Sequence, residues 1–310
     1  MPWRDAWPIA KETAKEWSED DASRLAASLA FYTLLSLAPL LVILVALAGV
    51  VLGPEAARGR ISSELASLMG SQAARGIEAV LASARSPAGG AISTVVGAVV
   101  LLVGASGVFG ELQFALNRIW EVKARPGRGI MGEVKDRFFS FTMVLGVAFL
   151  LLVSLVISAL LSAVGRFFAD ALPGGELLWQ VSNFVVSLAM VTVLFALIFK
   201  YVPDVSIRWR DVWLGAAVTA LLFTIGKSLL GIYLGKASFR SSYGAAGSLV
   251  VLVVWVYYSA QILFLGAEFT QVQAKRRGRV FRPTGKAVAM VERAEGIRNE
   301  RGRSTGGTPA

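Results

Sequence analysis

The chain contains no cysteine and no histidine. Without cysteine it has no disulfide, no thiolate nucleophile and no iron–sulfur cluster. Without histidine it has no imidazole base and no Ser-His-Asp triad, and protein zinc sites almost always use one of these two residue types. The sequence also lacks a P-loop, a glycine-rich dinucleotide fingerprint and an acidic cluster for Mg²⁺. We therefore expect no catalytic residues, no metal and no cofactor, and a protein that is not an enzyme.

Charge is scarce as well. Charged residues make up 17% of the 310 residues and hydrophobic residues 55%, whereas a soluble domain carries about 25% charged residues. Five uncharged stretches exceed the roughly 20 residues that cross about 30 Å of hydrocarbon. They are residues 25–54, 86–110, 138–165, 177–199 and 241–267. A sixth apolar stretch follows Asp211 and contains Lys227.

These stretches are too long, and too uniformly apolar, for the alternating strands of a membrane barrel. The predicted fold class is therefore all-α: a polytopic membrane protein with six transmembrane helices in a domain of residues 25–272. The spans are expected at about 27–52, 91–118, 138–164, 178–200, 212–233 and 246–268.

Lysine and arginine set the predicted orientation. With the N-terminus in the cytoplasm, 23 of the 31 Lys and Arg residues fall in cytoplasmic segments and seven in outer loops. This asymmetry places both termini inside. The net charge of +10 is concentrated in the same segments, where it suits an anionic inner leaflet. No RNA-binding motif accompanies it, so we expect membrane lipids, and no nucleic acid, as partners.

Three regions flank or interrupt the spans. Residues 1–24 are predicted as an amphipathic interfacial helix, because Trp3, Trp7, Ala10, Ala14 and Trp17 share one helical face. Packing of that face against the bundle is the alternative. Apolar residues at helical spacing predict short amphipathic helices in the first outer loop, 55–85. The basic, glycine-rich segment 273–310 is predicted to be a disordered cytoplasmic tail.

Polar residues inside spans are costly and are therefore the best candidates for function. Lys227 lies about 24 Å from the inner end of the fifth span at 1.5 Å per residue. It either snorkels to the outer interface or faces a polar cavity, where it would hold an anionic group or a carboxylate. Glu111 is predicted to lie in the inner half of the second span, and an intrahelical pair with Arg118 is the alternative.

The last span carries Tyr257, Gln261, Phe264 and Glu268 on one face. Such a stripe more often joins helices than binds a ligand. Glu268 is expected near the inner interface, paired with Arg118 or with a basic loop residue. In the first span, Pro39 removes a backbone hydrogen bond and predicts a kink beside Ser36.

Four segments together resemble a known family. They are AASLAFYTLLSLAPLL at 26–41, ELQFALNRIWEVKAR at 111–125, DVWLGAAVTALLFTIGKSLLGIYL at 211–234 and SSYGAAGSLVVLVVWVYYSAQILFLGAEF at 241–269. The resemblance is to the YihY/virulence factor BrkB family and covers about residues 20–272. The matched motifs pick out Ser36, Pro39, Asn117, Arg118, Trp120, Lys227, Tyr243, Gly244, Gly266 and Glu268.

The resemblance implies a six-span protein of the bacterial cytoplasmic (inner) membrane with no settled biochemical activity. Members were once labelled ribonuclease BN, and others have been linked to serum resistance and to envelope or lipid transport. A ribonuclease is disfavoured here, because the chain has no histidine, no zinc site and no cytoplasmic domain large enough to hold RNA. Intramembrane lipid chemistry by Glu111 or Glu268 stays open as an alternative.

The leading hypothesis is a protein that binds a lipid or anionic amphiphile and moves it across or within the membrane. Arg118 and Lys227 would contact the anionic head, and Glu111 would exchange a proton or hold an arginine. The candidate polar-cavity residues are Lys227, Glu111, Arg118, Asn117, Glu268, Gln261 and Tyr257, with Ser36 and Pro39 as a hinge. The alternative is a structural or regulatory envelope protein that binds a protein partner, or a second copy of itself, through its outer loop and tail.

Overall fold

The structure is a computed structural model that describes the chain in several ranges. These are residues 6–53, 107–124, 175–236, 247–279, 281–285 and 287–290, together with 55–56, 58–59, 61–63 and 78. The helices are α1 (Ala6–Glu19), α2 (Ala22–Leu52), α7 (Gly175–Tyr201), α8 (Trp209–Lys236) and α10 (Gly247–Arg276), and a further helix covers 107–119. The strands are β1 (Val122–Ala124), β2 (Val205–Ser206), β3 (Arg282–Pro283) and β4 (Ala287–Ala289).

Helices α7, α8 and α10 are each long and apolar enough to cross a membrane. Their lengths of 27, 28 and 30 residues correspond to about 40–45 Å at 1.5 Å per residue. The protein is therefore mostly helical, with at least three membrane-length apolar helices, which occupy the stretches where the last three spans were predicted. Helix α2 covers the expected span 27–52. Most of 91–118 and all of 138–164 lie outside the described residues.

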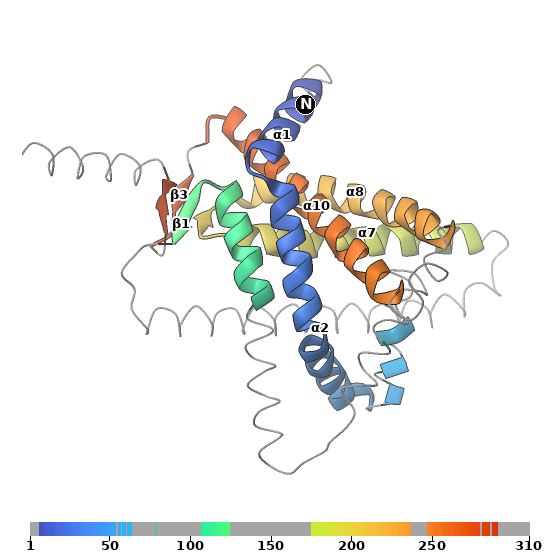
Figure 1. Cartoon of the computed structure of the whole chain (residues 1–310). Helices are drawn as coiled ribbons and strands as arrows, with labels where there is room; N and C mark the ends of the chain where they lie inside the picture. The colour runs from blue at the N-terminus through green and yellow to red at the C-terminus, as the bar shows by residue number, and fades with distance from the viewer. Residues whose placement is uncertain are drawn as a thin grey trace, which may run out of the picture.

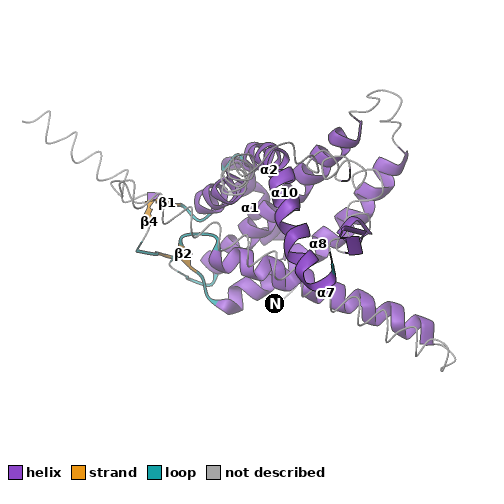
Figure 2. Cartoon of the chain, turned by 90° about the horizontal axis from the view of Figure 1, so that it is seen from below, coloured by secondary structure: helices purple, strands orange, loops and turns teal. Residues whose placement is uncertain are grey.

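Helix α10 lies at the centre of the described helices. It packs against α8 and α2, and α1 lies along it, while α7 packs against α8. Figure 2 shows the resulting order of α2, α10, α8 and α7 from below, and Figure 1 shows α1 beside one end of α10. Because α10 contacts three other helices, it links most of the described bundle.

Helices α8 and α10 approach closely through a repeated pattern in which a threonine follows a glycine by four positions. A Cβ atom on Gly215 would lie 1.8 Å from Thr270 Oγ1, and one on Gly266 would lie 1.9 Å from Thr219 Oγ1. The two helices are thus antiparallel, and each glycine faces the threonine of the other. Each threonine hydroxyl donates to the carbonyl of the glycine in its own helix, at 2.7 Å for Thr219 and 2.6 Å for Thr270. Small residues allow this close contact inside a membrane.

The buried core is densest where the helix 107–119, α2, α7, α8 and α10 meet. Its largest fully buried side chains include Trp120, Phe199 and Phe264. Elsewhere the helices expose large apolar side chains, among them Phe31, Leu35, Phe184, Ile225 and Leu229. Exposed apolar surface of this extent is expected where lipid covers the protein.

Two short antiparallel sheets join segments that are far apart in the sequence. Strand β1 pairs with β4 in the register Val122↔Ala289, and β2 pairs with β3 in the register Val205↔Pro283. The protein is mostly helical, as predicted, with these short strands in addition. The prediction of a disordered tail from residue 273 is wrong in part: residues 273–276 complete α10, and β3 and β4 pair their backbone groups with β2 and β1. Residues 291–310 lie outside the described residues.

Helix α1 buries Ile9 and Thr13, whereas Trp7 is 77% exposed and Ala10 and Ala14 are exposed too. Trp17 packs partly against the core. The alternative, in which the face of Trp7, Ala10 and Ala14 packs against the bundle, is therefore not seen at these three residues. The position of this face at the membrane surface stays a prediction.

The segment 55–85, predicted as the first outer loop, is described only at a few helical positions. Ile61 is buried, and the Ser62 hydroxyl donates to the Glu78 carboxylate. This bond joins the two halves of the loop. The remaining residues of the predicted loop helices lie outside the described part.

Candidate functional site

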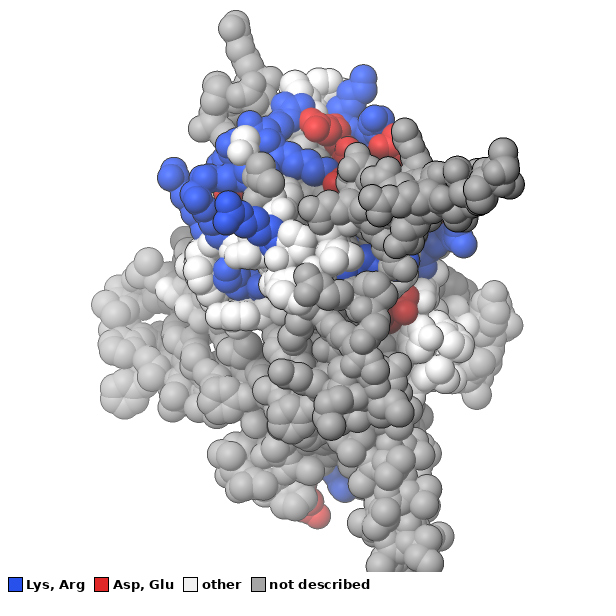
Figure 3. Space-filling view, turned by 90° about the vertical axis from the view of Figure 1, so that its left-hand side faces the viewer, with Lys and Arg blue, Asp and Glu red and all other residues white. Residues whose placement is uncertain are grey.

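Charged side chains gather where several helices begin or end. We call this the polar end; it comprises the α1–α2 turn and three further segments, residues 118–124, 201–211 and 268–290, of which 280 and 286 lie outside the described residues. Figure 3 looks onto this side of the molecule and shows Lys and Arg side chains clustered around fewer acidic ones. Hydrogen bonds and ion pairs connect all four segments, as described below.

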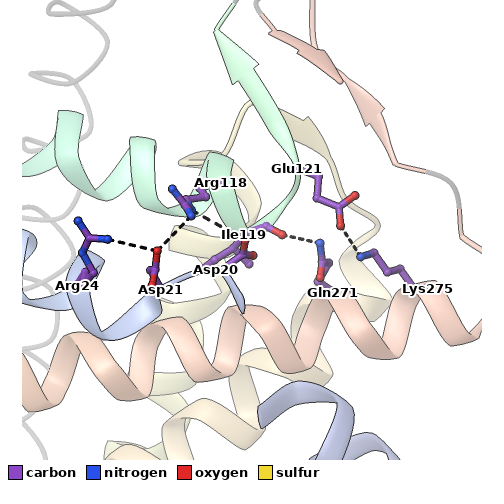
Figure 4. Close-up of polar contacts among 8 residues, drawn as sticks. All are labelled: Asp20, Asp21, Arg24, Arg118, Ile119, Glu121, Gln271 and Lys275. Atoms are coloured by element: carbon purple, nitrogen blue, oxygen red, sulfur yellow. Dashed lines mark hydrogen bonds and ion pairs between the residues drawn. The ribbon is translucent and has the colours of Figure 1, made fainter. Parts of the chain in front are cut away.

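Arg118 ties the helix 107–119 to the α1–α2 turn. Its guanidinium lies 3.9 Å from Asp20 Oδ1 and 3.6 Å from Asp21 Oδ2, and Asp21 also pairs with Arg24 at 3.5 Å. Figure 4 shows Arg118 reaching this turn. Arg118 therefore pairs with Asp20 and Asp21. The predicted alternatives, a pair with Glu111 or with Glu268, do not occur among the described residues. Asp21 has φ of 55°, a left-handed conformation that aspartate tolerates better than most residues.

Helix α10 holds the end of the same helix. The Gln271 side-chain amide donates to the Ile119 carbonyl, and Lys275 Nζ lies 2.7 Å from Glu121 Oε1 (Figure 4). Glu121 also has a left-handed φ, of 54°. Gln271 and Lys275 continue the helical stripe of Tyr257, Gln261, Phe264 and Glu268. The C-terminal part of this stripe therefore joins α10 to the end of the helix 107–119.

Glu268 is a carboxyl group with no access to solvent. Its exposed fraction is 0%, and within the described residues neither of its oxygens accepts a hydrogen bond from a protein donor. The Asp20 carboxyl group lies within hydrogen-bonding reach of Glu268, and the charges of Glu16 and Lys275 also act on it. Two ionised carboxylates are both acceptors, so a contact between them becomes a hydrogen bond only when one carries a proton.

Asp20 lies between Glu268 and solvent. Burial raises the pKa of Asp20 above its ordinary value of 3.8, although its side chain stays 23% exposed. The Arg118 charge opposes this shift in pKa, whereas Glu16 and Glu121 add to it. The chain thus places a partly exposed acid directly against a buried one.

Asn117 holds a different acid in place. The Asn117 amide donates to Asp204 Oδ2 at 3.0 Å and accepts from the Asp204 N–H at 2.7 Å, and Gln113 donates to the same carboxylate at 3.2 Å. The Asp204 carbonyl accepts from the Thr284 N–H at 3.0 Å. Asn117 is therefore part of the structural joint between the helix 107–119, the α7–α8 connection and the segment after α10.

Asp211 forms a further joint. Its buried carboxylate, in the first turn of α8, lies 2.9 Å from Arg277 Nη1 and 3.9 Å from Arg279 Nε. A carboxylate near a helix N-terminus is also favoured by the helix dipole. Sequence reasoning missed both Asp204 and Asp211, because each lies in a loop or at a helix start and finds its partners far away in the sequence.

Lys227 lies apart from this cluster. It is half-buried on α8, next to Gly226, whose added Cβ would meet Tyr258 and Ile262 of α10. Glu268 lies between the levels of Thr219 and Gly215, about ten residues or roughly 15 Å along α8. Among the residues that the structure describes, Lys227 makes no ion pair.

The other predicted site residues lie at separate positions in the bundle. Glu111 is half-exposed, eight residues before Ile119, and forms no ion pair with a described residue. Tyr257 packs against the core, and the Gln261 side-chain oxygen is buried without a described donor. Ser36 is buried, and α2 continues as a helix through Pro39. The described positions thus bring Arg118 and Glu268 close to Asp20, and leave Lys227 outside this group.

No group of three or more Asp and Glu side chains suited to a metal ion occurs among the described residues. The carboxyl pair of Asp20 and Glu268, together with Arg118, is the arrangement at the polar end with the clearest chemical capacity. It can hold a proton and exchange it with solvent.

The chain is similar to a set of bacterial membrane proteins. It is 31% identical over 278 residues to a UPF0761 membrane protein of Albidiferax ferrireducens, with 86% of this chain and 62% of that protein covered. It is 30% identical to one of Verminephrobacter eiseniae and 26% identical to one of Pseudomonas aeruginosa, with the same two shares covered. The chain thus spans less than two thirds of the length of these relatives.

No solved structure matches this chain. The family model described as virulence factor BrkB matches residues 13–290. That range includes every described element from the later part of α1 to β4. The chain therefore belongs to the virulence factor BrkB (YihY) family of integral membrane proteins.

Proposed function

We propose that this protein binds a lipid or other anionic amphiphile and moves it across or within the bacterial inner membrane. The proposal includes six spans with both termini in the cytoplasm. The observation that carries it is Lys227, a cation inside an apolar span that forms no ion pair within the described part of the chain.

The placement of the polar end supports the topology in this proposal. The four segments gathered there belong to the four parts of the chain expected in the cytoplasm. If one end of the bundle holds the turn before α2 and the segment after α10, an even number of crossings separates them. Six spans meet this condition.

An aromatic cluster supports the position of the membrane boundary. Tyr201, Trp209 and Trp213 are all exposed and contact one another in sequence, edge to face for Tyr201–Trp209 and tilted for Trp209–Trp213, with ring centroids 6.0 and 6.2 Å apart. Lys200 Nζ lies 5.7 Å from the centroid of the Trp209 ring. Exposed Trp and Tyr beside basic residues are typical of the membrane–water interface. The cluster supports a position of the polar end at the headgroup level.

The chemistry of Lys227 favours an anionic ligand. A charged side chain inside a membrane helix costs about 2.5–3.5 kcal/mol on insertion scales, and such residues usually pair with an opposite charge or face a polar cavity. The predicted spans contain only two carboxylates, Glu111 and Glu268. Neither pairs with Lys227, so a phosphate or carboxylate head group is the counter-charge that we propose.

The test is lipid mass spectrometry of the purified protein and of Lys227→Met. Lys123→Met removes an equal charge from an exposed position on β1 and serves as the control. We expect the wild type and Lys123→Met to retain a specific anionic lipid that Lys227→Met loses. If all three retain only bulk membrane lipid, the site at Lys227 is rejected. Crosslinking would then test the alternative, a structural or regulatory protein that binds a partner through its outer loop and tail.

A further inference from the structure

Several buried side-chain oxygens on α10 lack a described hydrogen-bond donor. Within the described residues, the side-chain oxygens of Gln261 and Gln271 and both oxygens of Glu268 are buried without a donor. Gln271 and Glu268 are three positions apart, so they lie on the same helical face. A buried polar group without a partner costs about 1–3 kcal/mol. At Glu268, a bound proton would turn one of these acceptors into a donor.

The carboxyl contact shows where that donor would be most effective. The α1–α2 turn that carries Asp20 joins two helices that both pack on α10, and Arg118 holds Asp20 at this turn. Asp20 thus lies within hydrogen-bonding reach of Glu268, which is fully shielded from water. Two ionised carboxylates in such a place would repel each other where water cannot screen them. A single proton removes one charge and converts the contact into a hydrogen bond, as in other paired carboxyl groups.

We propose that Asp20 and Glu268 together bind one proton and form a proton-exchange site at the polar end of the bundle. The proton comes from water at that end, forms an O–H bond with one carboxyl oxygen, and is donated to the facing oxygen of the other carboxyl group. Asp20 is the entry, because part of its side chain reaches solvent. Glu268 is the buried member.

Charged groups on each neighbouring element face this pair. Glu16 of α1 and Glu121 beyond the helix 107–119 favour the protonated form, whereas Arg118 and Lys275 favour the ionised form. Loss of the proton leaves repulsion between the α1–α2 turn and α10. Proton binding is therefore coupled to the docking of α1 on α10, which the Glu12–Arg276 ion pair also supports.

The site can be tested in the full-length protein without any transported ligand. Infrared difference spectroscopy of the protein in nanodiscs, recorded through a pH titration, detects the carbonyl band of a protonated carboxyl group. We expect a band that disappears as the pH rises, that is absent in Glu268→Gln, and that disappears at a lower pH in Asp20→Asn because the facing negative charge is gone. Glu19→Gln changes an acid of α1 that pairs with Lys15 and is 58% exposed, so this control should retain the band.

Three results would overturn the proposal. The first is no titrating band in the wild type. The second is a band that persists in Glu268→Gln, or one that Asp20→Asn leaves at the wild-type pH. The third is loss of the band at constant pH when choline is replaced by sodium at fixed ionic strength, because the pair would then hold a metal cation. If Glu268→Gln does not fold, Asp20→Asn and the wild-type titration decide the matter alone. A failed lipid assay at Lys227 leaves this result unaffected.

Discussion

Asn117 forms two hydrogen bonds with Asp204: its side-chain amide donates to the carboxylate at 3.0 Å, and its side-chain oxygen accepts from the backbone N–H at 2.7 Å. The two residues are 87 positions apart in the sequence. Asp204 in turn accepts from the Thr284 N–H and lies beside strand β2. One buried amide thereby fixes three segments of the polar end.

Replacing this amide should weaken the fold. Asn117→Ala removes both bonds and leaves a backbone N–H without its partner, which should lower the free energy of unfolding by about 1–3 kcal/mol. Gln113→Ala, on the same helix, removes one longer bond from a half-exposed side chain and should cost less. Denaturant titration in the same detergent gives the free energy of unfolding of each variant and of the wild type. Equal losses for the two variants would show that Asn117 has no special role.

The contact between α8 and α10 yields a second prediction. Gly266→Ala places a methyl group where Thr219 Oγ1 lies 1.9 Å away, so the helices must separate and the loss should be about 1–3 kcal/mol. The double variant Gly266→Ala/Thr219→Gly exchanges the small and large partners and should recover part of that loss.

Gly110→Ala is the control for this experiment. A Cβ on Gly110 meets nothing within 4 Å, and alanine is favoured over glycine in a helix by up to about 1 kcal/mol. It should therefore be neutral or stabilising. If Gly266→Ala behaves like Gly110→Ala, or if Thr219→Gly gives no rescue, the close approach of the two helices is not as described.

The sequence predicted the helices well, because the cost of placing charge in lipid makes uncharged stretches easy to recognise. It failed at their ends. The predicted last span stops at Glu268, the first charged residue, whereas α10 continues to Arg276. Glu268, Thr270 and Gln271 are buried against other helices, so they never face lipid, and a rule based on the cost of charge in lipid misplaces the end.

The site could be predicted only in part, for a related reason. The cost of an intramembrane charge identified Lys227, Glu111 and Glu268 one at a time. It carries no information about which of them meet. The partner of Glu268 is Asp20, in a two-residue turn before the first span, and hydrophobic periodicity does not reveal that contact. The strands β3 and β4 are two and three residues long, too short to show a period.

The raised pKa of Asp20 predicts how stability depends on pH. At pH values between 3.8 and its raised value, the folded state binds more protons at Asp20 than the unfolded state does. The free energy of unfolding should therefore fall as the pH rises through this window, and change little from this group below or above it. Asp20→Asn should flatten this part of the curve, as measured by denaturant titration from about pH 4 to about pH 8.

Replacing Arg118 should change the pH range over which Asp20 affects stability. Its charge lowers the pKa of Asp20, so Arg118→Gln should raise that pKa further and extend the window to higher pH. Arg24→Gln is the control, because Arg24 pairs with Asp21 and its side chain is 84% exposed. A shift in Arg24→Gln as large as that in Arg118→Gln would assign the effect to the net charge of the turn.

The absence of cysteine makes the proposed topology directly measurable. Each single-cysteine variant reports one position with no background from native thiols. Ser206→Cys lies at the polar end, at an exposed position of β2. Glu55→Cys lies just beyond the far end of α2, whose 31 residues separate it from the polar end by about 46 Å.

A membrane-impermeant maleimide should label Glu55→Cys in cells whose outer membrane alone is permeabilised. It should label Ser206→Cys only in inverted inner-membrane vesicles. The reverse pattern would place the polar end outside, against the 23 basic residues counted for the cytoplasmic side, and the proton bound by Asp20 and Glu268 would then come from the outer face of the membrane.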